Sequence, residues 1–76
     1  MEGDLQTEWV AEGDSEWRDG HRLTPYHIKC ENGSEYWRVV CERAGETLWS
    51  KTNPSRLTAF QLVYDEMEFR KRQKPT

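Results

Sequence analysis

Alternating hydrophobic and polar positions in the middle of the chain predict three short strands, over residues 26–30, 35–43 and 46–51. The second segment is rich in aromatic and β-branched residues, which favour the half-buried surface of a sheet. Asn32-Gly33 is a strong signal for a two-residue hairpin turn, and Ala44-Gly45 allows a second tight turn. The pattern therefore predicts two consecutive antiparallel hairpins.

The segment that begins at Pro54 contains no glycine and no second proline until about Arg72, and it predicts one helix. Asn53 or Thr52 can cap this helix, and proline is tolerated at the first helical position. The basic run 70–72 suits the negative end of the helix dipole. The helix is therefore expected to end close to the C-terminus of the chain.

The hydrophobic residues of this helix fall on one broad stripe at about 100° per residue. The stripe consists of Leu57, Phe60, Val63, Tyr64 and Met67, with Ala59 at its edge. One stripe can cover one face of a sheet. The expected fold class is therefore α+β: a three-stranded antiparallel sheet packed on one C-terminal helix (β-β-β-α), with an acidic N-terminal arm.

Two-residue turns would also fix the register, because directly opposed residues share a face of the sheet. Cys30 would then lie opposite Glu35, and Cys41 opposite Leu48. The expected core face collects Tyr26, Ile28, Cys30, Trp37, Val39, Cys41 and Leu48. The outer face collects His27, Lys29, Tyr36, Arg38, Val40, Trp49 and Lys51.

The net charge of −3 over 76 residues hides an uneven distribution. Residues 1–20 carry seven acidic residues and one base, whereas the remainder carries ten bases and seven acidic residues. We therefore divide the chain into an acidic arm over residues 1–22, flexible or docked, and a single small domain over residues 23–76.

A chain this short buries only about 60% of its unfolded surface, so modest stability or a homodimer is expected. No apolar run reaches the ~18 residues of a membrane span, and no secretory signal is visible, so the expected location is the cytoplasm.

Two tryptophans in the acidic arm need an explanation, because a purely solvating tail would not carry them. Either they fold back onto the domain, for example onto two apolar helix residues that lie off the main stripe, or they contact a partner protein. The arm could also engage a basic groove by mimicking phosphate, or be a solvated tail. The predicted partner-binding residues are Trp9, Glu12, Asp14, Glu16, Trp17, Leu62 and Phe69.

The outer sheet face offers an alternative, because bases interleaved with aromatic side chains can bind nucleic acid. The predicted nucleic-acid-binding residues are His27, Lys29, Tyr36, Arg38, Trp49 and Lys51. The negative net charge argues against a simple nucleic-acid binder, since phosphate neutralisation supplies most of the non-specific affinity.

In element order and spacing, residues 26–69 resemble two families of nucleic-acid-binding domains. Tyr36-Trp37-Arg38-Val39, Gly45 with Leu48, and Ala59 with Tyr64-Asp65 lie where the arm-binding domains of phage integrases and plant ethylene-response factors have their strand, turn and helix residues. The double-stranded-RNA-binding domain has a similar β-β-β-α core. In size and charge the chain resembles phage-encoded inhibitors, anti-CRISPR proteins among them.

Catalytic and metal-binding groups are sparse. Cys30 and Cys41 both face the core in the expected register, so two reduced, buried thiols are expected, and a disulfide only in another register. The chain shows no set of four zinc ligands and no glycine-rich phosphate loop, so neither a metal nor another cofactor is expected.

We expect no enzyme but a small protein-interaction module, such as an anti-CRISPR-like inhibitor or an accessory factor of a nucleic-acid-handling protein. Direct DNA or RNA binding is the alternative.

Overall fold

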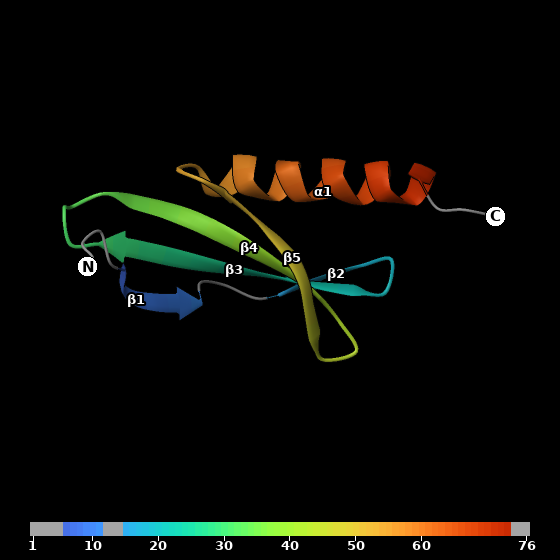
Figure 1. The fold of residues 1–76 in the computed structure, drawn as a ribbon, viewed down its shortest axis with the longest axis horizontal. Coiled ribbons are helices and arrows are strands. Elements are labelled where there is room, and N and C mark those ends of the chain that lie inside the picture. Colours follow the sequence, from blue (N-terminus) through green and yellow to red (C-terminus); the bar gives the residue numbers. More distant parts are fainter. Residues whose placement is uncertain (1–5, 12–14, 74–76) are drawn as a thin grey trace.

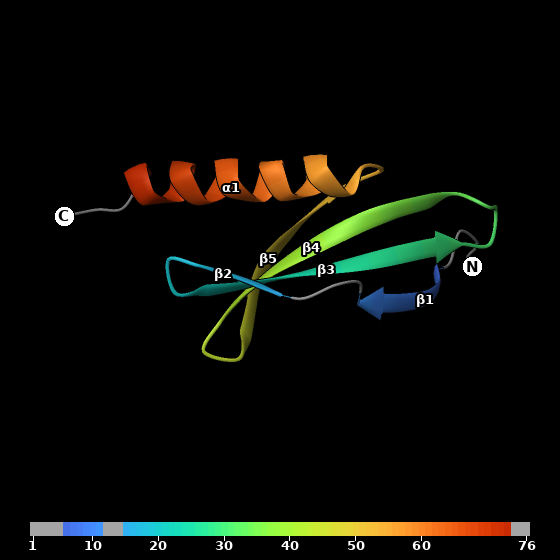
Figure 2. The ribbon, with the colours of Figure 1, turned by 180° about the vertical axis from the view of Figure 1, so that it is seen from behind.

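The computed structural model describes residues 6–11 and 15–73, which form an antiparallel sheet with a helix on one face (Figure 1). The elements in chain order are β1 (Gln6–Ala11), β2 (Glu16–Arg18), β3 (His21–Cys30), β4 (Glu35–Arg43), β5 (Glu46–Asn53) and α1 (Arg56–Gln73). Views from the front and from behind agree that α1 runs along one side of the sheet (Figure 2). Within the described residues no helix lies on the other side.

The sheet has the order β1-β3-β4-β5, and β2 also pairs with β3. Both β1 and β2 thus lie beside β3, where β2 pairs with residues 21–23 and β1 with residues 26–30. Pro25 falls between these two stretches, and proline cannot donate a ladder hydrogen bond. The α+β class, the antiparallel sheet and the C-terminal helix are confirmed, but the prediction of three strands was wrong, because a fourth strand position is filled by β1 and β2.

The β2–β3 turn is the element that the sequence reasoning missed. Asp19 and Gly20 have φ angles of 52° and 78°, the left-handed pair that a tight two-residue hairpin turn requires. Asp-Gly is among the strongest sequence signals for this turn, but it lies within the segment treated as an arm. The expected boundary between residues 22 and 23 falls inside β3.

The β3–β4 turn contains three residues rather than two. The Cys30 N–H donates to the Ser34 carbonyl at 2.9 Å, and Gly33, with φ 93°, donates to the Cys30 carbonyl at 3.0 Å. Ile28 consequently lies opposite Tyr36. A shift of one residue exchanges the faces of a strand, so the expected register was wrong, and Tyr26, Ile28 and Cys30 lie on the face opposite the helix. Ile28 is nevertheless fully buried, as predicted.

The β4–β5 turn lies at Ala44-Gly45 as predicted, but the strand after it contains a bulge. Glu42 is opposite Thr47, whereas Cys41 is opposite Trp49, which leaves Leu48 as the additional residue. Leu48 is 45% exposed, so its predicted core position was wrong. A bulge shifts the alternation of the strand, so Trp49 and Lys51 lie on the helix side instead of the outer face.

The core lies between α1 and the three strands β3, β4 and β5. Its buried residues are Leu23, Val39, Cys41, Ala59, Phe60 and Val63, and Trp37, Trp49, Tyr64 and Met67 pack against them half-buried. The predicted stripe is confirmed except for Leu57, which is 69% exposed. The centre of the stripe lies nearer Ala59 and Val63, which leaves Leu57 at its margin.

The start of α1 is set by Ser55 rather than by Asn53, Thr52 or Pro54. The Thr58 N–H donates to the Ser55 hydroxyl at 3.3 Å, which is the bond of an N-cap residue. Asn53 accepts a hydrogen bond from the Ser55 N–H at 2.9 Å and so turns the chain just before the helix. The prediction that Pro54 is the first helical residue was therefore wrong.

Candidate functional site

Lys51, Glu66 and Arg70 form a group of paired charges on the helix side of the sheet. Glu66 of α1 lies 3.2 Å from the ammonium of Lys51 on β5 and 2.5 Å from the guanidinium of Arg70. Hydrogen bonds from Arg70 and then Lys51 lower the pKa of Glu66 below its ordinary value. The Arg70 guanidinium also lies 5.1 Å from the ring centroid of Trp49. Lys51 and Trp49, both predicted to bind nucleic acid, are thus part of the contact between the sheet and the helix.

His27 lies on the same side, opposite Trp37. The two rings stack with centroids 4.6 Å apart, and the His27 Nε2 lies 2.9 Å from a carboxylate oxygen of Glu35. Lys29, two residues after His27 on β3, lies opposite Glu35 on β4. His27, Lys29, Trp49 and Lys51 therefore share the helix side, whereas Tyr36 and Arg38 lie on the other side. The structure does not bring the six predicted nucleic-acid residues together.

The face of the sheet opposite α1, called here the helix-free face, presents alternate residues of β2 to β5. Its members are Trp17, Arg22, Thr24, Tyr26, Ile28, Cys30, Tyr36, Arg38, Val40, Glu42, Thr47, Ser50 and Thr52. Ile28 is fully buried and Thr24 nearly so. In the β1–β3 register Trp9 is the partner of Ile28, so the backbone of Trp9 belongs to a strand of the sheet.

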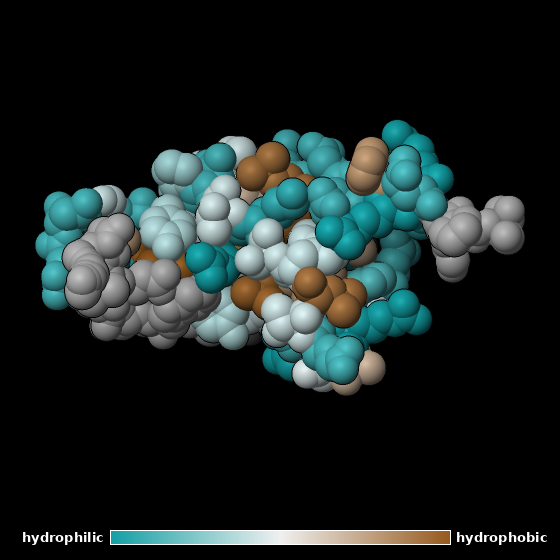
Figure 3. Space-filling model, in the orientation of Figure 1, coloured by the Kyte–Doolittle hydropathy of each residue, from teal (hydrophilic) through white to brown (hydrophobic). Residues whose placement is uncertain are grey.

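Trp17 is the most exposed of the large hydrophobic side chains in the described residues, at 70%. The other three are Leu48, Leu57 and Phe69. Figure 3 shows how hydrophobic patches interrupt the largely hydrophilic surface on one side of the molecule. Trp17 points away from α1, so it does not dock on the helix residues considered for it in the sequence.

The residues before and after Trp17 on β2, Glu16 and Arg18, both contact Tyr64 of α1. The Tyr64 hydroxyl donates to the Glu16 carboxylate at 2.5 Å, and the Arg18 guanidinium lies 4.2 Å from the Tyr64 ring centroid. Burial, followed by the bond to Glu16, raises the pKa of Tyr64 above its ordinary value. Because side chains alternate along a strand, holding Glu16 and Arg18 toward the helix directs Trp17 to the helix-free face.

Trp17 begins a row of side chains that crosses four strands. The register places Trp17 opposite Arg22, Arg22 opposite Glu42, and Glu42 opposite Thr47. We call these four residues the Trp17 row. Arg22 donates to the Ser15 hydroxyl at 3.1 Å, and Ser15 shares a hydrogen bond of 3.0 Å with Thr24. Arg22 was not among the predicted site residues, although the Asp19-Gly20 turn signal places it beside Trp17.

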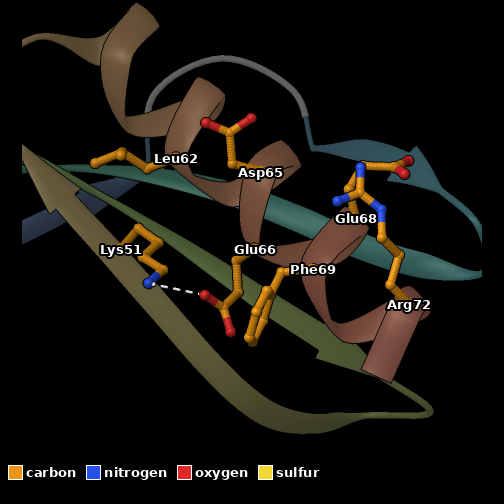
Figure 4. A pocket seen from close by; sticks show the side chains of 7 residues that line it. All are labelled: Lys51, Leu62, Asp65, Glu66, Glu68, Phe69 and Arg72. Carbon is orange, nitrogen blue, oxygen red and sulfur yellow. Dashed lines mark ion pairs between the residues drawn. The ribbon is translucent and has the colours of Figure 1, made fainter. Parts of the chain in front are cut away.

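Leu62 and Phe69 line a hollow of about 520 Å³ between α1 and β5 (Figure 4). Phe69 is 54% exposed and Leu62 is half-buried. Lys51 and Glu66, joined by an ion pair, form the side of the hollow next to β5. The predicted partner-binding residues thus separate: Trp17 lies on the helix-free face, Leu62 and Phe69 lie on the helix, and Glu12 and Asp14 lie outside the described residues.

The two cysteines lie on opposite faces of the sheet. Cys41 is buried in the core, where burial raises the pKa of its thiol, and Cys30 is half-buried at the end of β3. Both thiols are free, but only Cys41 is buried, so the expectation of two buried thiols was wrong for Cys30. In the described part of the chain no three histidine, cysteine, aspartate or glutamate side chains gather as a metal site would require.

None of the described helices is both long and apolar enough to cross a membrane. No family model, curated protein or solved structure matches this chain.

Proposed function

We propose that the chain is a non-catalytic protein-binding module that contacts its partner through the Trp17 row. The observation that carries the proposal is the 70% exposure of Trp17 on a short strand that is attached to the rest of the molecule. Tryptophan is enriched among the residues that dominate protein interfaces, where truncation costs about 2 kcal/mol or more. An exposed tryptophan in a fixed position is therefore suited to anchor a partner.

The environment of Trp17 favours binding without rearrangement. The Asp19-Gly20 turn fixes one end of β2, and the contacts of Glu16 and Arg18 with Tyr64 fix its orientation. A side chain that is already held in place loses less conformational freedom on binding. Arg22 beside Trp17 adds a type of residue that is also enriched in interfaces.

The experiment is affinity capture from a lysate of the native host with the tagged chain, followed by mass spectrometry. Leu57→Ala is a matched control for Trp17→Ala, because Leu57 is 69% exposed and lies on α1, away from the Trp17 row. The proposal expects proteins that are captured by the wild type and by Leu57→Ala but lost with Trp17→Ala. Equal capture by all three chains would refute it.

Point substitutions test this surface better than removal of residues 1–20. Those residues include β1 and β2, so their removal would expose the edge of β3. An exposed strand edge promotes association with other strands. Loss of capture after truncation would then report on the sheet as well as on Trp17.

The identity of the captured protein tests the finer proposal, that the partner handles nucleic acid and is inhibited or assisted by this chain. Direct nucleic-acid binding stays a second prediction. Of the residues named for it, Tyr36 and Arg38 share the helix-free face with Trp17. A titration with labelled DNA and RNA at two salt concentrations, with Arg38→Glu as the variant, tests that alternative.

A further inference from the structure

A cleft of about 590 Å³ opens where the end of α1 meets the β2–β3 turn and the β4–β5 hairpin. Both ribbon views place these three segments at the end of the molecule where α1 terminates (Figures 1 and 2). The half-buried side chains of Trp49 and Met67 contribute the apolar part of its lining. The cleft lies on the helix side, so it is separate from the Trp17 row.

The rim of the cleft is mainly cationic. Arg43, Arg70 and Lys71 line it together with His21, against a single acidic residue, Asp19. Asp19 lies 3.5 Å from the Lys71 ammonium, so its charge is already partly compensated. The lining thus carries three cations against one carboxylate. Lys71 is paired with Asp19 and Arg70 with Glu66, so Arg43 is the charge that remains uncompensated next to the apolar lining.

Arg43 and Arg70 differ in how far they are engaged. Arg70 is held by Glu66 at 2.5 Å and by the face of Trp49. Arg43 is exposed and lines the cleft, and none of the hydrogen bonds, ion pairs or ring contacts of the described residues involves its side chain. The guanidinium of Arg43 is thus available for an external anion, and such groups bind carboxylates in a bidentate manner.

We propose that this cleft binds an acidic peptide segment that carries an apolar side chain. Its carboxylates would pair with Arg43 and Lys71, and its apolar side chain would contact Trp49 and Met67. A nucleic acid fits less well, because Arg70 already covers one face of the Trp49 ring, where a base would stack.

The test measures fluorescence anisotropy of a labelled short peptide in which aspartate and glutamate alternate with leucine and phenylalanine. We expect binding to the wild-type chain and at least about tenfold weaker binding of the same peptide with asparagine and glutamine in place of the acids. Arg43→Glu should weaken binding of the acidic peptide by about tenfold or more. Arg72→Glu is the matched control, since it makes the same charge change on α1 outside the cleft, and it should change the affinity by no more than about twofold.

Three results would overturn the proposal: equal binding by Arg43→Glu and the wild type, equal binding of the acidic and amide peptides, or tighter binding of an oligothymidine probe. Trp17→Ala should bind the acidic peptide like the wild type, so this test is independent of the proposed function. Should Arg43→Glu unfold, chemical-shift mapping on the wild-type chain decides. Peptide-induced shifts at the Trp49 indole and at Lys71 support the site, and shifts confined to other residues refute it.

Discussion

The two ends of the helix-free face differ sharply, although both lie along the same strand. Toward the end of β3, Ile28 is fully buried, and its backbone partner on the neighbouring strand is Trp9. Near the start of β3, Trp17 on β2 is 70% exposed. The same face of one sheet thus buries an isoleucine at one end and leaves a tryptophan in solvent at the other.

This difference shows that exposure of Trp17 does not follow from a general lack of burial on the helix-free face. It follows from local attachment, since Glu16 and Arg18 hold β2 against Tyr64 with the tryptophan turned away. The Ile28 end is expected to contribute to stability, and the Trp17 end to binding. Truncation of Ile28 should therefore lower stability, whereas truncation of Trp17 should weaken partner binding and leave stability nearly unchanged.

The largest effect on stability is expected from Ile28→Ala. Truncation of a fully buried isoleucine costs about 2–5 kcal/mol of unfolding free energy, measured by urea denaturation. Leu57→Ala, at an exposed position, should change stability by no more than about 0.5 kcal/mol. A small effect of Ile28→Ala would mean that this end of the face is not packed in solution.

A smaller effect is expected from Gly20→Ala in the β2–β3 turn. A Cβ at this position meets nothing within 4 Å, so the cost is conformational and arises from the φ angle of 78°. We expect a loss of about 1 kcal/mol in thermal or urea unfolding. Asparagine tolerates this backbone region better, so Gly20→Asn should lose less; equal losses would argue against the left-handed turn.

The sequence predicts the parts of this fold that rest on local signals. The β4 segment, the Ala44-Gly45 turn and most of the helix stripe were confirmed because each depends on a short pattern. The faces of β3 and β5 were wrong because they depend on a three-residue turn at Gly33 and on a bulge at Leu48, and neither changes the hydrophobic pattern that was used.

The candidate site was affected by the same shifts. Since a one-residue change in register exchanges the faces of a strand, the predicted basic and aromatic face separated into two sides of the sheet. Trp17 was predicted as a partner-binding residue, but its neighbours on the sheet were not. Only the pairing of β2 with β3 places Arg22 beside it, and that pairing required the Asp19-Gly20 turn.

The ion pairs of Glu66, between α1 and β5, are a third region whose contribution to stability can be compared with those of Ile28 and Trp17. Because Arg70 and Lys51 lower the pKa of Glu66, its contribution to stability is present above the ordinary glutamate pKa of about 4.3 and is lost as the pH falls through the lowered value. The wild type should exceed Glu66→Gln in unfolding free energy near neutral pH, and this difference should narrow as the pH falls below the ordinary glutamate pKa. A difference that is constant with pH would contradict the pairing.

The smallest effect on stability is expected from Trp17→Ala. Removing a side chain that is mostly in solvent should change the unfolding free energy by no more than about 0.5 kcal/mol. The circular dichroism spectrum in the far ultraviolet should stay unchanged. A loss as large as that of Ile28→Ala would show that Trp17 packs against the molecule in solution, and the contrast between the two ends would disappear.

The most direct test is the affinity of the captured partner, once purified, for the wild type, Trp17→Ala and Leu57→Ala by isothermal titration calorimetry. If the Trp17 row is the binding surface, Trp17→Ala should bind about 30-fold more weakly or worse, which corresponds to a loss of about 2 kcal/mol. Leu57→Ala should bind within about twofold of the wild type, as expected of a residue outside the interface. Equal affinity of Trp17→Ala and the wild type would contradict the account.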